Sequence, residues 1–146
     1  MEKKTLIRPM KIEDIDDVLK IEQVAFEKQS RDDFIRCINR GEVYKYFVLE
    51  EDGKIIGYYG MSAISDEGEL LTIALNPEKR GRGYASQMMR TCILQAGFSG
   101  SKKIFLEVNE NNMIAIILYK KFGFREISRR KNYYGKDDAI IMQKDL

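Results

Sequence analysis

The chain has 146 residues, 44% of them hydrophobic and 33% charged, which is typical of one globular domain spanning residues 1–146. A formal net charge of +2 argues against a dedicated nucleic-acid-binding protein, because such domains are normally strongly basic. No apolar run approaches the roughly 18 residues that cross a bilayer, and the N-terminus lacks the apolar segment of a secretory signal, so we expect a cytoplasmic protein without membrane contact.

Local patterns at the N-terminus predict a strand followed by two helices. Residues 5–8 favour a short strand that ends before Pro9, and apolar residues at helical spacing follow from Ile12 to Ala25. Ser30 with an acidic residue three positions later forms a capping box, which predicts the start of the second helix. We expect Gly41 to end that helix.

Three strands joined by tight turns are predicted next, over residues 43–49, 55–64 and 69–75. An Asp-Gly turn at 52–53 connects the first two strands, and a second turn at 66–68 leads into the third. Strands connected in this way form an antiparallel meander.

The second half of the chain alternates helices and strands. It comprises a loop at 76–83, a helix at 84–96 closed by Gly97, a strand at 103–108, a helix at 113–122 capped by Asn112, and strands at 124–129 and 139–143. The helix between strands 69–75 and 103–108 implies that these two strands pair in parallel. We therefore expect an α/β fold with a mixed six- to seven-stranded sheet and helices on both faces.

The loop before the helix at 84–96 has features of an anion site. Backbone N–H groups at a helix N-terminus attract phosphate oxygens, and Gly81 and Gly83 let the main chain approach an anion closely. Arg80 and Arg82 add positive charge. The loop is neither a Walker loop nor a Rossmann fingerprint, and its composition alone also fits a solvated basic turn.

The segment Arg80-Gly81-Arg82-Gly83-Tyr84-Ala85 resembles the pyrophosphate motif of the GNAT N-acetyltransferases, Arg/Gln-x-x-Gly-x-Gly/Ala, in the same strand–loop–helix context. The resemblance implies acetyl-CoA as cosubstrate, with no metal. It implies that backbone N–H groups of the loop bind the pyrophosphate and that the preceding strand binds the pantetheine arm. The implied acetyl-CoA contacts are Ile73, Ala74, Leu75, Arg80, Gly81, Arg82, Gly83, Tyr84, Ala85, Ser86 and Asn112.

Candidate acid–base residues are limited because the chain has no histidine, which also excludes a histidine-ligated metal site. Glu107 stands near the end of an apolar strand, where burial would raise the pKa of the carboxyl and suit it to act as a general base. It could equally emerge at an exposed strand end. Tyr119 on the following helix could be an acid or a core aromatic.

Residues 69–142 resemble the RimI type of GNAT enzyme, which acetylates the N-terminal alanine of a ribosomal protein. The matching residues include Glu107-Val108, Asn112, Leu118-Tyr119 and Tyr133-Tyr134. By this resemblance Glu107 is the general base, Tyr119 is the general acid, and a protein N-terminus is the acceptor. Asn112 then contacts CoA, and Tyr133 and Tyr134 bind the substrate.

The acceptor stays open, because residues 26–30 depart from the aromatic and proline-containing loop of RimI-type enzymes. One alternative is a small amine such as a polyamine, an amino acid or an aminoglycoside. A polyamine could be attracted by acidic residues of the first helix, namely Asp14, Asp16, Asp17 and Glu22. Two further alternatives are a non-catalytic acyl-CoA sensor and a nucleic-acid module built on the basic run at 129–131.

Two residue types remain to be assigned. Tyr44, Tyr46, Tyr58 and Tyr59 could line a substrate groove or could simply cover the sheet. Cys37 and Cys92 lack the spacing of a metal or redox pair, so we expect buried apolar thiols without a catalytic role. We expect a monomer or a weak dimer.

Overall fold

The computed structural model describes residues 3–22, 31–39 and 43–146. The predicted capping serine Ser30, the segment 26–30 and the predicted helix end at Gly41 lie outside the described residues.

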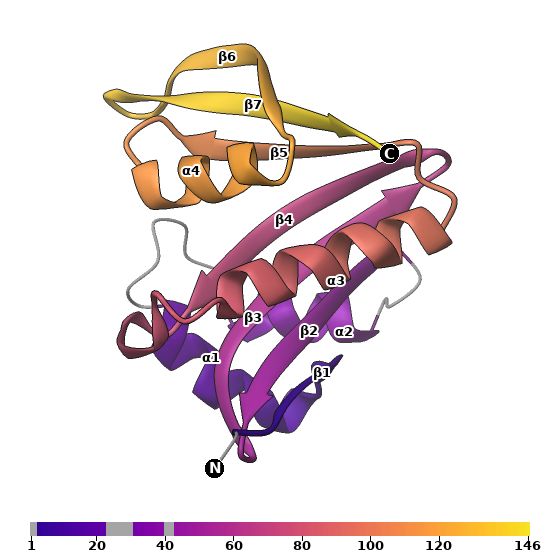
Figure 1. Ribbon diagram of the computed structural model, residues 1–146, viewed down its shortest axis with the longest axis vertical. Helices are drawn as coiled ribbons and strands as arrows, with labels where there is room; N and C mark the ends of the chain where they lie inside the picture. Colours follow the sequence, from indigo (N-terminus) through magenta and orange to yellow (C-terminus); the bar gives the residue numbers. More distant parts are fainter. Residues whose placement is uncertain (1–2, 23–30, 40–42) are drawn as a thin grey trace.

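One seven-stranded mixed sheet forms the centre of the molecule, as predicted (Figure 1). The strand order is β1-β2-β3-β4-β5-β7-β6, and β4 and β5 are the parallel pair among otherwise antiparallel neighbours. The strands are β1 (Thr5–Pro9), β2 (Tyr44–Glu51), β3 (Lys54–Ile64), β4 (Glu67–Leu75), β5 (Lys103–Asn109), β6 (Arg125–Tyr134) and β7 (Asp137–Asp145).

Helices cover both faces of the sheet (Figure 1). They are α1 (Ile15–Glu22), α2 (Arg31–Asn39), α3 (Tyr84–Phe98) and α4 (Met113–Lys121), with short 3-10 turns η1 (Ile12–Asp14) and η2 (Pro77–Lys79) before α1 and α3. The predicted end of α3 at Gly97 is wrong, because the helix continues through Gly97 to Phe98. The chain turns instead at Gly100, whose φ of +88° is the left-handed conformation that glycine favours.

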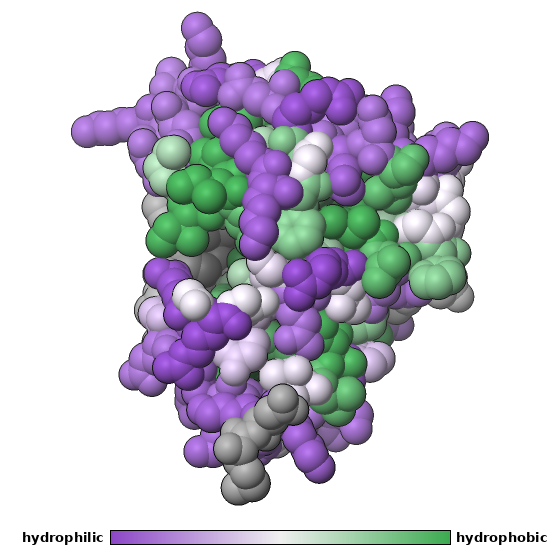
Figure 2. All heavy atoms as spheres, viewed as in Figure 1, coloured by the Kyte–Doolittle hydropathy of each residue, from purple (hydrophilic) through white to green (hydrophobic). Residues whose placement is uncertain are grey.

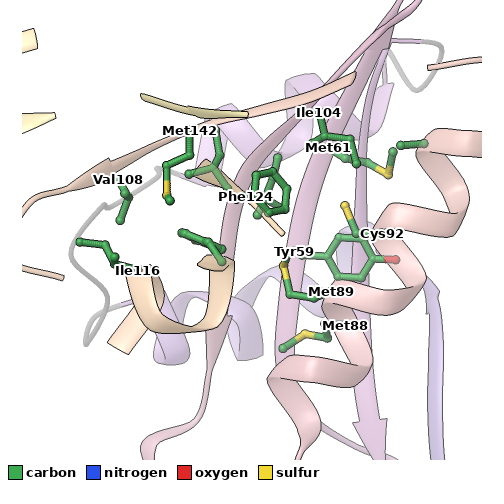
Figure 3. Packing of buried hydrophobic residues seen from close by; sticks show 14 of the residues in the cluster. Tyr59, Met61, Met88, Met89, Cys92, Ile104, Val108, Ile116, Phe124 and Met142 are labelled. Carbon is green, nitrogen blue, oxygen red and sulfur yellow. The ribbon is translucent and has the colours of Figure 1, made fainter. Parts of the chain in front are cut away.

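Two hydrophobic cores lie on opposite faces of the sheet. The larger one joins α3 and α4 to the sheet and contains Cys92, Met89 and Tyr59 (Figure 3). The smaller one joins α1 and α2 to the sheet and contains Phe34 and Tyr58. Because β3 is buried on both faces, consecutive tyrosines 58 and 59 point into different cores, and neither is available to line a substrate groove.

The last two strands are longer than predicted, at 125–134 and 137–145 instead of 124–129 and 139–143. The polar strand β6 is the sheet edge and is exposed along almost its whole length. It therefore carries no alternation of apolar and polar residues from which its extent could be predicted.

Within the described part of the chain, no helix combines the length and the apolar content that crossing a bilayer requires.

Candidate active site

The parallel strands β4 and β5 separate in the middle of the sheet. They pair only from Glu67 to Leu70 on β4 and from Lys103 to Leu106 on β5, although both strands continue beyond. Against β3, the register of β4 shifts at this point and leaves Leu71 as an extra residue, which is a β-bulge that bends the strand. Past Leu70, the edge of β4 that faces β5 has no strand partner among the described residues.

A cavity of about 290 Å³ lies between the separated strands. Its lining residues come from α1, β4, the loop before α3, the start of α3, β5 and α4. They include Ile73, Ala74, Leu75, Arg80, Ala85, Glu107, Asn112, Leu118 and Tyr119. Ile21 and Tyr119 both line it although they belong to different cores, so the cavity extends through the sheet. Figure 2 shows the surface hollowed between α4 and the loop before α3.

The start of α3 offers uncommitted backbone donors. Gly83 precedes the helix with a φ of +86° and provides no side-chain cap, and the first backbone bond of the helix runs from Gln87 N–H to Gly83 O over 3.0 Å. The amide groups of residues 84–86 therefore come before the first helical bond and can donate to an anion. These donors, with Arg80 and Arg82 in the adjoining loop, fit a pyrophosphate.

The side chain of Glu51, at the end of β2, holds this loop in place through hydrogen bonds. Its buried carboxylate accepts hydrogen bonds from Lys79 Nζ at 2.7 Å and from the Tyr84 hydroxyl. These two donors, with a smaller contribution from the charge of Lys3, lower the pKa of Glu51 to about 2. Ser86 is also held by its side chain, because Lys121 Nζ on α4 donates to its hydroxyl at 3.1 Å.

Glu107 is partly exposed, which lies between the two possibilities that the sequence left open. The neighbouring residues Leu106 and Val108 pack in the core beneath α3 and α4, so Glu107 points to the opposite face, where α1 and α2 contact β2, β3 and β4. Its side chain is 29% exposed and forms an ion pair of 3.2 Å with Arg130 on β6.

A second hollow, here called the tyrosine pocket, adjoins the cavity. It is lined by Cys37, Tyr44, Tyr46, Glu69, Leu71, Glu107, Tyr133 and Tyr134. Glu107 and Leu71 line both the cavity and the tyrosine pocket, so the carboxylate of Glu107 lies where the two meet. The rings of Tyr133 and Tyr134 pack edge to face with 5.1 Å between their centroids.

Most of the residues selected from the sequence lie around these two hollows. Ile73, Ala74, Leu75, Arg80, Ala85, Glu107, Asn112 and Tyr119 line the cavity, Gly81, Arg82, Gly83, Tyr84 and Ser86 form the loop and the start of α3, and Tyr133 and Tyr134 line the tyrosine pocket. Asn112 also caps α4, as predicted, because its Oδ1 accepts from Ala115 N–H at 3.3 Å.

The two cysteines differ from each other. Cys92 is buried as predicted, and burial raises the pKa of its thiol to about 12. Cys37 is only partly buried and lines the tyrosine pocket.

The residues near the site that were not selected as site residues from the sequence include Glu51, Glu69, Leu71 and Arg130. The signal for Glu69 was present, because a carboxylate on each of two parallel strands can meet on one face of the sheet. The contact of Arg130 with Glu107 depends on the path of the exposed edge strand β6, which leaves no pattern in the sequence.

Three acidic residues of η1 and α1 each form an ion pair with a basic residue. Asp14 binds Arg8 at 2.7 Å, and hydrogen bonding to that guanidinium lowers the pKa of Asp14. Asp16 pairs with Arg31, and Asp17 with Lys20 at 3.7 Å. The side chain of Glu22 lies outside the described residues.

The basic run at 129–131 is partly neutralised as well. Arg129 pairs with Glu126 at 3.0 Å, and Arg130 pairs with Glu107. Within the described residues, no three carboxylate or cysteine side chains group as metal ligands would.

Comparison with known proteins identifies the family. The model of the acetyltransferase (GNAT) family matches residues 12–124. A putative [ribosomal protein bS18]-alanine N-acetyltransferase of Bacillus subtilis (strain 168) is 34% identical over 145 residues, which cover 97% of this chain and 96% of that protein. The [ribosomal protein bS18]-alanine N-acetyltransferase of Haemophilus influenzae is 37% identical over 109 residues, covering 71% and 74%.

Solved structures agree with this assignment. The crystal structure of the ribosomal-protein-S18-alanine N-acetyltransferase from Escherichia coli superposes with a TM-score of 0.87 at 30% identity, over 98% of this chain and 94% of that chain. The chain belongs to the acetyltransferase (GNAT) family and is an N-acetyltransferase, as the motif at 80–85 predicted.

Proposed function

We propose that this enzyme transfers the acetyl group of acetyl-CoA to the α-amine of an N-terminal alanine in a ribosomal protein. The observation that carries the proposal is the position of Glu107, where the cavity at the start of α3 meets the tyrosine pocket. A donor in the cavity and an amine in the tyrosine pocket would meet at this carboxylate. The names of the relatives at 34% and 37% identity support the acceptor, and a ribosomal acceptor would place the reaction in the cytoplasm.

We propose that the donor lies along the separated edge of β4. The amide groups of residues 84–86, with Arg80 and Arg82, would bind the pyrophosphate. The backbone of Ile73 to Leu75, on the edge of β4 that faces β5, would hydrogen-bond the pantetheine arm, as an additional strand would do in this position. Asn112 would contact the donor from the start of α4.

Glu107 would take a proton from the acceptor ammonium, through a water molecule, because an ammonium has no lone pair with which to attack. The freed nitrogen then forms a bond to the thioester carbon. A backbone N–H near Leu75 would stabilise the oxyanion that develops. When the carbon–sulfur bond breaks, Tyr119 would donate its proton to the leaving thiolate, and the second proton lost by the nitrogen would restore the Tyr119 hydroxyl. Transfer is direct, so neither cysteine is needed as a nucleophile.

The test is release of CoA thiol from acetyl-CoA with a short peptide that begins with alanine, followed by mass spectrometry of the product. The matched control is the same peptide with a blocked α-amine, which keeps its side chains and loses only the proposed acceptor group. A panel of polyamines, amino acids and aminoglycosides tests the alternative acceptors.

We expect one acetyl group on the α-amine of the free peptide and none on the blocked one. Transfer only to the small amines would contradict the peptide acceptor while leaving the acetyltransferase activity in place. Tight CoA binding without transfer to any acceptor would favour the non-catalytic sensor.

A further inference from the structure

The tyrosine pocket contains two carboxylates, and among the described residues a cationic partner is found for one of them. Glu107 Oε1 lies 3.2 Å from Arg130. Among the described residues, Glu69 makes no ion pair within 4 Å and no side-chain hydrogen bond. Within the described part of the chain, the negative charge of Glu107 is therefore paired with a basic side chain, whereas that of Glu69 is not.

The sheet register brings these two carboxylates together. Glu69 on β4 pairs with Phe105 on β5, and Glu107 stands two residues beyond Phe105. Side chains two residues apart project to the same face of a strand, so Glu69 and Glu107 are diagonal neighbours on one face. Both line the tyrosine pocket, whereas the cavity for the donor is reached by Glu107 and not by Glu69.

The electrostatic environment of Glu69 favours a bound cation. Glu69 lies on the solvent side of the pocket, but the surrounding protein still removes part of the water around its carboxylate. This partial burial, followed by the negative charge of Glu107, raises the pKa of Glu69, and the charge of Arg130 opposes the shift. A cation that contacted Glu69 would offset both the lost hydration and the repulsion.

We propose that Glu69 binds the ammonium group of the acceptor and positions it for Glu107. This division of roles rests on the function proposed above. The ammonium would arrive as the ion-pair partner of Glu69 and surrender one proton towards Glu107. Its nitrogen then bonds to the acetyl carbon, the carbon–sulfur bond breaks, and the thiolate is protonated by Tyr119. The second proton that the nitrogen loses on becoming an amide restores the Tyr119 hydroxyl, and the proton held by Glu107 leaves to solvent. Glu69 keeps its own charge throughout, so it determines acceptor affinity and not the chemical step.

The test separates affinity from turnover in the full-length enzyme with an alanine-initiated peptide. For Glu69→Gln we expect the acceptor KM to rise by about 10-fold or more, the scale of a charge-assisted hydrogen bond. We expect kcat to stay within about threefold of the wild-type value, and the KM for acetyl-CoA to stay unchanged. Glu69→Asp keeps the charge on a shorter side chain, so its acceptor KM should fall between those of the wild type and Glu69→Gln.

The matched control is Glu67→Gln. Glu67 is exposed, lies two residues earlier on the same face of β4, and does not line the tyrosine pocket. Glu67→Gln changes the net charge by the same amount as Glu69→Gln, and we expect the wild-type values of kcat and of both KM constants. An equal rise in acceptor KM for both variants would indicate a general charge effect and overturn the proposal.

Two other results would also overturn it. A wild-type acceptor KM in Glu69→Gln would show that Glu69 does not bind the ammonium, and a large fall in kcat at constant KM would make it a proton acceptor instead. Both results require active enzyme and leave the proposed function intact. Absence of transfer to the peptide by the wild-type enzyme would instead contradict the proposed function itself. If Glu69→Gln does not fold, Glu69→Asp measured against Glu67→Asp decides the same question.

Discussion

Glu107 is proposed as the base because of where it lies more than because of how deeply it is buried. The sequence left open a carboxylate removed from water and one at an exposed strand end, and the structure lies between the two: the side chain is 29% exposed and is held by Arg130. The sequence singled out the residue as a candidate, because a single acid in an apolar strand is unusual. It could not show which face of β5 would remain open, since that depends on where α1 and α2 end along the sheet.

Replacing Glu107 by glutamine should lower kcat by about 10²-fold or more, the usual scale for losing a general base. The amide keeps the shape of the side chain, so the KM for acetyl-CoA should stay the same. Steady-state kinetics with the alanine peptide measure both constants. Glu67→Gln again serves as the control, and an unchanged kcat in Glu107→Gln would remove this residue from the mechanism.

Tyr119→Phe removes one hydroxyl from a side chain that is 6% exposed and packs near Phe124, with 6.0 Å between the ring centroids. If Tyr119 protonates the thiolate, kcat should fall by roughly 10- to 100-fold, while the ring and its packing remain. Thermal unfolding monitored in parallel should change little. A normal rate combined with a lower Tm would instead make Tyr119 a packing residue.

The separation of β4 from β5 is the structural element on which the site depends. The sequence predicted both strands and their parallel pairing, together with the glycine loop that follows. It did not predict the bulge at Leu71, because one extra residue changes the register against β3 without altering the composition of the strand. The cavity between the strands therefore had to be found in the structure.

Glycine at position 83 should be required both for the backbone and for the anion. With a φ of +86°, alanine there costs about 1–2 kcal/mol of backbone strain, although its Cβ meets no atom within 4 Å. Gly100 has a φ of +88° and equally open surroundings at the other end of α3, so Gly100→Ala provides a matched control. Both variants should lose similar stability, and only Gly83→Ala should raise the KM for acetyl-CoA. Equal KM values in the two variants would contradict the anion site at this loop.

Glu51 should stabilise the same loop in a pH-dependent way. Its folded-state pKa of about 2 lies below the ordinary value of 4.5, so its contribution to stability is complete above pH 4.5 and is lost as the pH falls towards 2. Glu51→Gln lacks this contribution. The difference in Tm between the wild type and this variant should therefore be largest above pH 4.5 and should narrow on acidification.

Glu51→Gln also weakens the hydrogen bonds that Tyr84 and Lys79 donate to this side chain. Because these bonds hold the loop, the KM for acetyl-CoA should rise while kcat stays nearly constant. The exposed Glu78 on η2 provides the control, and Glu78→Gln should change neither quantity. A difference in Tm that does not vary with pH would argue against an ionised Glu51 as the anchor.

At the scale of the whole molecule, the sheet separates two cores, and the active-site cavity passes between them. Largely apolar elements bounded by turn or loop residues, such as β3 and α3, were predicted close to their observed bounds. The polar edge strand β6 was not, and its end supplies Arg130, Tyr133 and Tyr134 to the site. The donor side of the site was thus accessible from local motifs, whereas the acceptor side is assembled from α2, β2, β4, β5 and β6 by long-range pairing.

Mass spectrometry of an alanine-initiated peptide after incubation with acetyl-CoA shows whether the α-amine of an N-terminal alanine accepts the acetyl group. We expect a single acetyl group on the α-amine, and no modification of the matched peptide whose α-amine is blocked. Acetylation of polyamines or free amino acids in place of the peptide would contradict this expectation.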